Sequence, residues 1–260
     1  MTVRDRVALV TGGGSGLGEA AARVLAREGA KVAVVGRSED ELREVAQSIK
    51  ADGGEAAAVT ADIADAQAVE NAVRQVVERW GRLDIVFANA GINGVWASID
   101  DLTPDDWQET INVNLNGTFY TIKYAAPYLK RNGGSVIITS SVNGTRIFSN
   151  TGATAYSCSK AAQVAMAKML ALELAKYRVR VNVICPGAIE SEIEENTEKR
   201  DVEREKEPVE FPEGEIPLTD GAPGKAEDVG ELVLFLASDA SKHITGTEIW
   251  IDGGQSLLQG

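Results

Sequence analysis

The sequence contains very little histidine and cysteine, and both scarcities narrow the possible chemistry. His243 is the single histidine, so a zinc site built from several histidines is impossible, and a Ser-His-Asp triad would have to use that residue. The two cysteines, Cys158 and Cys185, form no C-x-x-C pair, and we expect two buried or half-buried thiols rather than a disulfide. We therefore expect no metal site, and many hydrolase mechanisms are removed.

Long apolar runs and positive charge are also in short supply. No eighteen consecutive residues are apolar, so we expect no membrane span, and the start MTVRDRVALVTG lacks the pattern of a signal peptide. We therefore expect a cytoplasmic protein. The net charge is −13, which disfavours nucleic acid as a partner. Residues 190–215 hold twelve acidic and four basic side chains, so −8 of this charge lies in one segment.

Short apolar strands alternate with helical segments along almost the whole chain. We expect strands in RVALVTG, KVAVVG, EAAAVTAD, LDIVFANAG, GSVIITSS, RVRVNVICPG and GTEIWIDGG. Strands as uniformly apolar as these suit a parallel sheet that helices cover on both faces. The pattern predicts one doubly wound α/β domain over residues 1–260, with seven parallel strands.

Two segments need separate comment. A long helix is expected to begin at Thr103 and Pro104, because threonine caps a helix and proline suits its first position, and to continue with a break to about Arg131. Residues 188–222 are rich in charge and proline and follow directly after a strand. This position favours a lid over a ligand site, with a surface excursion as the alternative.

A glycine-rich turn, TGGGSGLG, separates the first strand from the first helix. Glycine permits a tight turn and lets backbone N–H groups approach a pyrophosphate, and the helix N-terminus behind it favours negative charge. A plain tight turn is the alternative, but the position between first strand and first helix favours a dinucleotide site. The residues expected at this site are Gly12, Ser15, Gly16, Leu17 and Gly18.

The spacing G-x-x-x-G-x-G, with TG in front, resembles the short-chain dehydrogenase/reductase family, and six further motifs in the family's order extend the resemblance along the whole chain. They are NAG at Asn89, Ala90 and Gly91, NVN with Asn114, ITSS with Ser141, YSCSK with Tyr156 and Lys160, CPGAIES with Pro186, Gly187, Ile189 and Ser191, and WIDGG. The resemblance implies a Rossmann-type fold and an NAD(P)(H)-dependent oxidoreductase. Such an enzyme interconverts a secondary alcohol and a ketone, or acts on an aldehyde or sugar.

Tyr156 and Lys160 are four residues apart on an expected helix, so both can face one pocket. A tyrosine has a pKa of about 10 and is a poor base at neutral pH, but a nearby ammonium favours the phenolate and lowers that pKa. The phenol would then exchange a proton with a substrate oxygen, and Ser141 would hydrogen-bond the same oxygen. An exposed pair of helix residues is the alternative. By the resemblance, Lys160 also holds the nicotinamide ribose, and Asn114 supports a water that links it to solvent.

The family commonly separates its catalytic serine and tyrosine by thirteen positions, whereas Ser141 and Tyr156 are fifteen apart. The neighbouring Ser140 is a rival for the catalytic role, and Ser141 is chosen because SSVNG resembles the family's S-S-x-x-G, in which the second serine is active. The segment TRIFSNTGAT should bulge at the pocket rim, where Arg146 and Phe148 either contact substrate or belong to a solvated loop with one apolar anchor.

The residues after the second strand predict the cofactor. An acidic side chain there would bind the ribose 2′-OH of NAD(H), but Gly36 and Arg37 occupy this place. Gly36 leaves room for a 2′-phosphate, while Arg37 and Ser38 would bind it, so NADP(H) is favoured and NAD(H) is the alternative. By the resemblance, Asp62 and Ile63 contact the adenine, and Ser191 contacts the nicotinamide carboxamide.

The substrate side gives weaker signals. Asn93, Val95 and Trp96 follow the NAG motif and are expected to line the substrate pocket, although Trp96 also suits the core. The acidic segment disfavours an acyl carrier protein as partner and favours a small, neutral or partly apolar carbonyl or alcohol. The resemblance implies a homo-oligomer, a tetramer or dimer. A non-catalytic nucleotide-binding regulator is the alternative function, while a hydrolase that uses Ser141 and His243 is disfavoured because no G-x-S-x-G turn is present.

Overall fold

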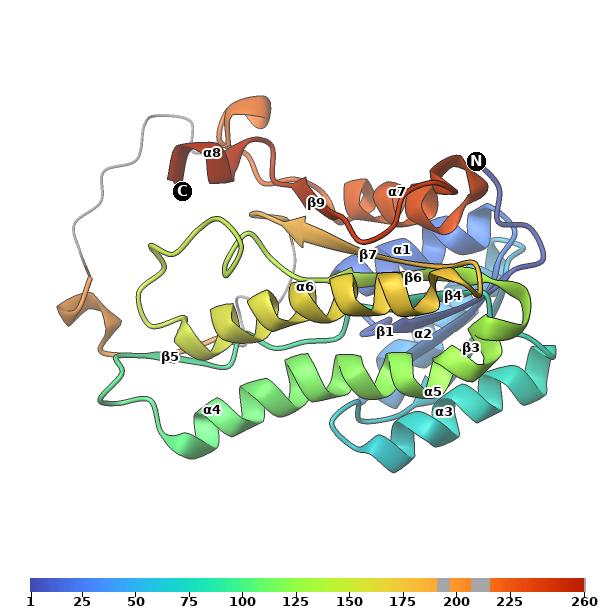
Figure 1. Cartoon of the computed structure of the whole chain (residues 1–260), viewed down its shortest axis with the longest axis horizontal. Coiled ribbons are helices and arrows are strands. Elements are labelled where there is room, and N and C mark those ends of the chain that lie inside the picture. The colour runs from blue at the N-terminus through green and yellow to red at the C-terminus, as the bar shows by residue number, and fades with distance from the viewer. Residues whose placement is uncertain (191–196, 207–215, 260) are drawn as a thin grey trace.

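The computed structural model describes residues 1–190, 197–206 and 216–259 (Figure 1). A seven-stranded parallel sheet with the order β3-β2-β1-β4-β6-β7-β9 forms its centre. The strands are β1 (Val7–Thr11), β2 (Lys31–Gly36), β3 (Glu55–Thr60), β4 (Ile85–Ala88), β6 (Gly134–Thr139), β7 (Val179–Pro186) and β9 (Glu248–Ile251). The prediction of seven parallel strands is confirmed.

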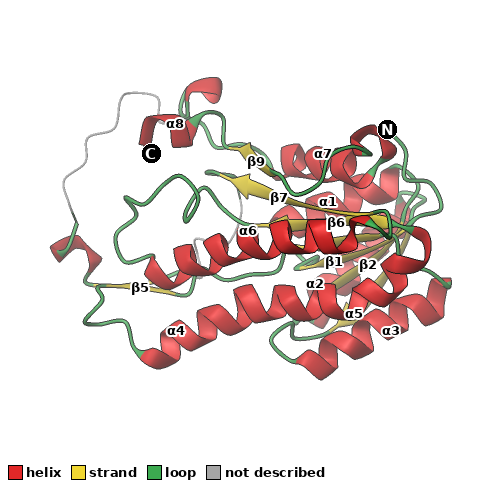
Figure 2. Ribbon diagram, in the orientation of Figure 1, coloured by secondary structure: helices red, strands yellow, loops and turns green. Residues whose placement is uncertain are grey.

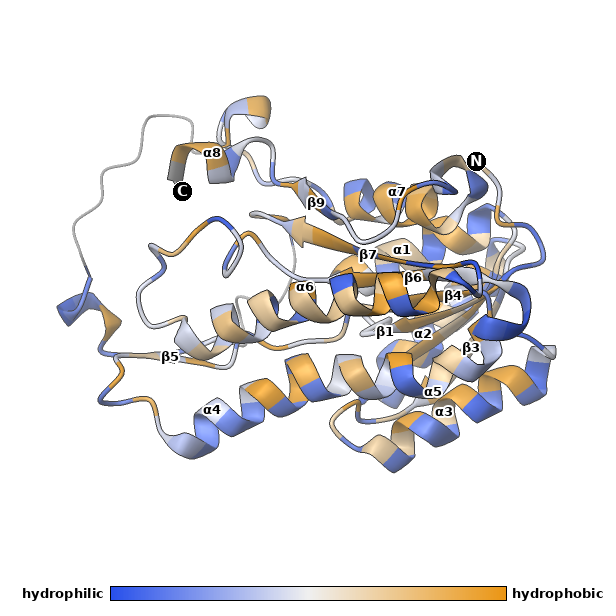
Figure 3. Cartoon of the chain, viewed as in Figure 1, coloured by the Kyte–Doolittle hydropathy of each residue, from blue (hydrophilic) through white to orange (hydrophobic). Residues whose placement is uncertain are grey.

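Helices cover both faces of this sheet, as Figures 1 and 2 show. One face carries α1 (Gly16–Arg27), α2 (Glu39–Ala51) and α7 (Ala226–Ala237), and the other carries α3 (Ala66–Trp80), α5 (Gly117–Asn132) and α6 (Thr154–Ala175). Side chains alternate along each strand, so every strand contributes to both buried layers. Helices α1, α2 and α3 turn apolar side chains inward and hydrophilic ones outward, whereas α6 also carries apolar residues on its outward side (Figure 3). Among the described helices, none is long and apolar enough to cross a membrane.

The predicted long helix is present, and its break is a turn of π-helix. Helix α4 (Pro104–Ile111) begins with a capping box, in which Thr103 and Asp106 each accept the other's backbone N–H at 3.2 Å. Asn112–Asn116 then forms the π turn that leads into α5. This turn brings Asn114 into the interior, where it is fully buried.

A second, two-stranded parallel sheet pairs β5 (Val95–Ala97) with β8 (Glu198–Arg200). Strand β8 belongs to the segment expected to be a lid, and two short 3₁₀ turns at Val202–Arg204 and Pro217–Thr219 follow it. Arg200 donates from Nη1 to Asp106 Oδ2 at 2.7 Å, so β8 is attached to the beginning of α4. The described part of this segment therefore has regular structure.

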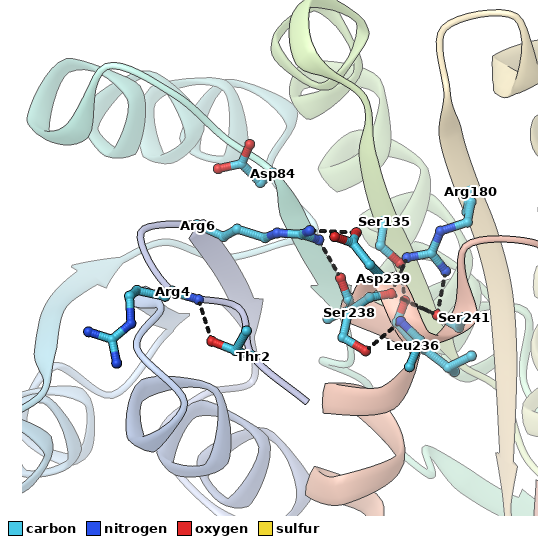
Figure 4. A network of polar contacts seen from close by, with 12 residues as sticks. Thr2, Arg4, Arg6, Asp84, Ser135, Arg180, Leu236, Ser238, Asp239 and Ser241 are labelled. Atoms are coloured by element: carbon cyan, nitrogen blue, oxygen red, sulfur yellow. Dashed lines mark hydrogen bonds and ion pairs between the residues drawn. The ribbon is translucent and has the colours of Figure 1, made fainter.

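Arginines bind the end of α7 to the amino edge of the sheet (Figure 4). Arg6, just before β1, pairs with Asp239 at 2.6 Å, and Arg180 of β7 donates to Ser241 Oγ at 2.8 Å. Asp239 and Ser241 bound the 3₁₀ turn that follows α7. This network lies at the amino-terminal ends of the strands. The predicted ligand site lies at the other edge of the sheet, at their carboxyl-terminal ends.

The carboxyl-terminal part of the chain ends in the short helix α8 (Gln255–Gln259). Of the two cysteines, Cys185 at the end of β7 is buried and Cys158 on α6 is exposed, so the expectation of two buried or half-buried thiols is wrong for Cys158. Both thiols are free, as predicted.

Candidate active site

A cavity of about 460 Å³ opens at the carboxyl edge of the main sheet. Open α/β sheets bind ligands at this edge. The predicted residues that line it are Gly12, Ser15, Gly16, Leu17, Arg37, Ser38, Asn89, Ala90, Gly91, Ser141, Tyr156, Lys160, Pro186, Gly187 and Ile189. Another cavity of about 600 Å³ lies between α1, α2 and α7 and contains none of them. The smaller cavity is therefore the candidate site.

The glycine turn forms a cradle at one end of the cavity. Gly12 and Gly16 have φ of +64° and +51°, which strain any residue with a side chain. A Cβ at Gly18 would lie 1.9 Å from the Gly12 carbonyl oxygen, so Gly18 lets α1 pack directly behind the turn. A cradle of backbone at a helix N-terminus fits the diphosphate of a nicotinamide dinucleotide.

Tyr156 and Ser141 come together from α6 and from the end of β6. Both side chains are buried, with 9% and 7% of their surface exposed. Burial raises the pKa of the Tyr156 phenol, and the hydrogen bond with the Ser141 hydroxyl opposes this to a smaller extent. The direction is opposite to the one expected from the Lys160 ammonium, whose Nζ lies 5.4 Å from the centre of the Tyr156 ring.

The rival serine has a different partner. The Ser140 hydroxyl donates to the Lys160 backbone oxygen at 2.8 Å, while the Ser141 hydroxyl accepts from Asn143 N at 3.1 Å and faces the phenol. The unusual spacing between Ser141 and Tyr156 therefore does not separate them, because the loop at 142–153 takes up the additional residues. The geometry favours Ser141 over Ser140.

Lys160 lies in the wall of the cavity with 3% of its surface exposed. Its Nζ donates to the Thr139 backbone oxygen at 2.9 Å. Burial lowers the pKa of the ammonium from 10.5 to about 8, because the low-dielectric interior disfavours charge. The Lys160 ammonium therefore loses its proton at a lower pH than an ordinary lysine.

Asn114 lies behind the cavity wall and does not line it. Its Oδ1 accepts the backbone N–H of Ile92 at 2.8 Å, and its Nδ2 donates to the Ile92 oxygen at 2.9 Å. A Cβ at Gly91 would lie 3.0 Å from Asn114 Oδ1 and 3.5 Å from Lys160 Nζ. Asn114 thus holds the backbone at Ile92, next to Gly91, and Gly91 has no side chain that would crowd Asn114 Oδ1 and Lys160 Nζ.

Arg37 and Ser38 line the cavity at the start of α2, and both are exposed. Glu41 of α2 also lines the cavity and was not predicted from the sequence. The predicted adenine contacts lie outside the lining. Asp62 accepts the Ala64 N–H at 2.9 Å, and Ile63 is buried against the backbone of α5.

Arg146 and Phe148 do not line the cavity, and their contact with substrate stays a prediction. The Arg146 guanidinium stacks 3.6 Å from the centre of the Trp250 ring and donates to Ser256 Oγ at 3.4 Å. Phe148 is 74% exposed, and Ile147, at 2%, is the apolar anchor of the loop. Arg146 therefore clamps the loop after Ser141 to β9 and α8.

The other predicted substrate contacts bind the segment that contains β8. Asn93 donates from Nδ2 to Thr197 Oγ1 at 2.7 Å, while Val95 and Trp96 belong to β5 and pair with β8. Trp96 is half-buried in β5, so it is not a fully buried core residue. None of the three lines the cavity, and Ser191 lies outside the described residues.

Several residues of the site were missed by sequence reasoning. The cavity lining includes Thr139, Ser140 and Ala188. Each is next to a predicted site residue or close to one in the sequence, and this proximity was the signal that could have indicated them. Gln255 gave no signal. Its Oε1 accepts the Ala188 N–H at 2.9 Å across 67 positions of the chain, a contact that only the packing of α8 creates.

The fold and the cavity define a dinucleotide-dependent oxidoreductase with a buried tyrosine and lysine. A family model described as Enoyl-(Acyl carrier protein) reductase matches residues 12–256. A 3-oxoacyl-[acyl-carrier-protein] reductase of Thermotoga maritima is 36% identical over 255 residues, covering 98% of this chain and 99% of that protein. The chain belongs to the short-chain dehydrogenase/reductase family.

Solved structures give the same result. A 3-ketoacyl-ACP reductase from Sinorhizobium meliloti 1021 is 54% identical, with a TM-score of 0.93 over 97% of this chain and 99% of that one. A short chain dehydrogenase from Burkholderia cenocepacia in complex with NADP is 35% identical, with a TM-score of 0.85 over 98% of this chain and 99% of that one. A Brucella melitensis reductase complexed with NADH is 30% identical, with a TM-score of 0.86 over 98% and 100%. The protein is an NAD(P)-dependent enzyme that acts on carbonyl or hydroxyl groups.

Proposed function

We propose that the protein interconverts a small secondary alcohol and the corresponding ketone, with Tyr156 as the acid and base. The observation that carries this proposal is the meeting of Tyr156, Lys160 and Ser141 with the glycine cradle in one cavity. The same set, scattered over the surface, would have favoured the non-catalytic regulator.

The roles follow from the contacts. A bound nicotinamide would supply or accept hydride at the substrate carbon. In reduction the Tyr156 phenol, whose protonated form burial favours, gives its proton to the carbonyl oxygen and becomes a phenolate. In oxidation the phenolate takes the proton of the alcohol. The Ser141 hydroxyl donates a hydrogen bond to the same oxygen as negative charge develops. Lys160 contributes positive charge beside the phenol, and Asn114 keeps the backbone around Lys160 in place.

We assign the cofactor preference to NADP(H). Arg37 and Ser38 lie at the end of the cavity beyond the glycine cradle, and a 2′-phosphate there would have a cationic partner. Glu41 in the same lining opposes this charge. The guanidinium is the better anion ligand because it offers several donors in a plane, so the balance favours the phosphate.

We propose a free small molecule as the substrate rather than one carried by an acidic protein. The comparison proteins include reductases named for acyl-carrier-protein substrates, and this favours a carbonyl compound of the 3-oxoacyl kind. The excess of acidic residues in 190–215 would repel an acidic carrier. A 3-oxoacyl thioester of a small neutral thiol meets both conditions.

We also propose that one domain of 260 residues assembles into a dimer or tetramer. Helices α5 and α6 expose apolar side chains, with Phe119 at 44%, Met169 at 74% and Leu172 at 84%. Large apolar side chains exposed to this extent favour burial between copies. The two long helices were expected to take this role from the resemblance.

One spectroscopic experiment tests the proposed reaction. Purified protein is mixed with NADPH and a panel of ketones, aldehydes, sugars and 3-oxoacyl thioesters, and the absorbance of the reduced nicotinamide is followed. Tyr156→Phe should remove turnover and leave NADPH binding intact, while Tyr128→Phe, half-buried on α5, should keep full activity. Near-normal kcat in Tyr156→Phe would refute the acid–base role. Cofactor binding without turnover on any panel member would favour the regulator.

A further inference from the structure

A buried amide lies on α6 one turn beyond Lys160. Gln163 is 1% exposed, and its Nε2 donates to the Asn114 backbone oxygen at 2.8 Å and to Thr118 Oγ1 at 2.9 Å. The Thr118 hydroxyl uses its own proton on the same Asn114 oxygen, at 2.7 Å. The reverse orientation of the amide would set two acceptors against each other, so the donor side must face Asn114.

The other side of this amide has no partner. Gln163 Oε1 is buried and accepts no hydrogen bond in the described part of the chain. A buried acceptor without a donor destabilises a fold, and an apolar side chain at this position would avoid that cost. An amide here is favourable only if the two hydrogen bonds from Nε2 stabilise or position another part of the protein.

Helix α6 holds Asn114 at two points one turn apart. Ser159 Oγ accepts from Asn114 Nδ2 at 3.0 Å, and Gln163, four residues later, binds the Asn114 carbonyl. A π turn is a rare local structure and needs support from its surroundings. Ser159 and Gln163 supply that support from a single helix face, the face that also carries Tyr156 and Lys160.

The consequence reaches the cavity through the backbone of residues 91 and 92. Asn114 fixes both the N–H and the carbonyl of Ile92, and the adjacent Gly91 lines the cavity next to Lys160 Nζ. A displacement of the Asn114 main chain would therefore move the wall at Gly91 toward or away from Lys160.

We propose that Gln163 is a positioning residue for the reaction. By holding the Asn114 carbonyl in the π turn, it sets the separation between the Gly91 wall and Lys160, and with it the placement of bound cofactor beside Tyr156. Gln163 acts through Asn114 and touches no reacting atom. The inference rests on the proposed function and adds to it a residue that none of the sequence motifs includes.

Two substitutions and one control test this proposal. Gln163→Met keeps the length of the side chain but donates nothing, so both hydrogen bonds from Nε2 are lost. We expect kcat to fall about tenfold and NADPH to bind about tenfold more weakly once the Asn114 carbonyl has lost this donor. Gln163→Glu can donate to the Asn114 oxygen only while its carboxyl is protonated. Its kcat relative to wild type at the same pH should therefore fall as pH rises, and this ratio removes the titration of Tyr156 and Lys160 themselves.

Asn182→Leu is the matched control. Asn182 is a fully buried amide of β7 that donates to the Ile244 oxygen at 2.9 Å, with no link to Asn114. This variant should lose thermal stability and keep the wild-type NADPH affinity and pH profile. The proposal is overturned if Gln163→Met behaves like this control, or if the Gln163→Glu ratio is flat with pH. If Gln163→Met does not fold, the pH dependence of kcat for Gln163→Glu relative to wild type decides. NADPH binding needs no turnover, so a failure of the proposed reaction is detected separately, as absence of turnover in the wild type.

Discussion

Replacing Lys160 with methionine should stabilise the folded protein at pH 7 while it removes catalytic activity. The ammonium is 3% exposed, and burial lowers its pKa from 10.5 to about 8. A group whose charged form is disfavoured in the fold destabilises that fold wherever it stays charged. Methionine has a similar length and carries no charge, so it removes this cost.

The magnitude follows from the pKa. One pKa unit corresponds to about 1.36 kcal/mol, so a fall from 10.5 to about 8 costs about 3 kcal/mol of folding free energy at pH 7. The variant also loses the hydrogen bond from Nζ to the Thr139 oxygen, worth about 1 kcal/mol. We therefore expect a net stabilisation of about 2 kcal/mol, which raises Tm by roughly 4–8 °C for a chain of this size.

The pH dependence gives the sharper test. Below pH 8 both folded and unfolded lysine are protonated, and the full cost applies. Between pH 8 and 10.5 the unfolded chain retains a proton that the folded protein has lost, so the stability of wild type rises with pH relative to the variant. The difference between the two proteins should narrow across this window and approach a constant above it.

Urea unfolding of both proteins at pH 7, 8, 9 and 10, at one protein concentration, measures this difference. Lys168→Met is the control, because Lys168 lies on the same helix, is 56% exposed and pairs with Glu248 at 2.6 Å. That substitution should not stabilise the protein. An unchanged or lower stability of Lys160→Met at pH 7, or a difference that stays constant from pH 7 to 10, would refute the reasoning.

Three further predictions concern the choice of cofactor, the segment that contains β8, and the assembly of the protein into oligomers. Arg37→Ala should lower kcat/KM for NADPH about tenfold or more and leave kcat/KM for NADH nearly unchanged. Initial rates with both cofactors measure this, and equal effects on the two would exclude selection of NADP(H) by Arg37. Arg200→Ala breaks the contact with Asp106 and should raise substrate KM a few-fold at constant kcat, since a partly exposed ion pair contributes about 1 kcal/mol or less; an unchanged KM would show that β8 does not bear on binding. Leu172→Glu should reduce the mass measured by light scattering to that of a smaller assembly, whereas a wild-type mass would contradict an interface on α6.

The sequence was informative where the signal was local. The alternation of apolar strands and helices predicted the seven-stranded sheet, because each element must present its own apolar face to the core. Thr103 predicted the start of α4, because its hydroxyl accepts a free backbone N–H of the first turn. Spacing on one helix predicted that Tyr156 and Lys160 line a common wall, since residues four apart share a face.

The sequence carried no signal where long-range packing decides. Nothing near Arg146 indicated that its guanidinium stacks on Trp250, more than a hundred positions later. Nothing in the acidic segment indicated that Glu198–Arg200 pairs with β5 as a strand. No pattern near Gln163 indicated that its amide reaches Asn114 across 49 positions.

The motifs by themselves therefore predicted the fold, the glycine turn beside the cavity and the proposed roles of Tyr156 and Lys160, because short stretches of chain carry those signals. Only the tertiary structure decided which serine faces the phenol, which amides hold the π turn, and in which direction the pKa values of Tyr156 and Lys160 move. Those outcomes depend on burial and on contacts between distant segments, and both come into existence only when the chain is packed.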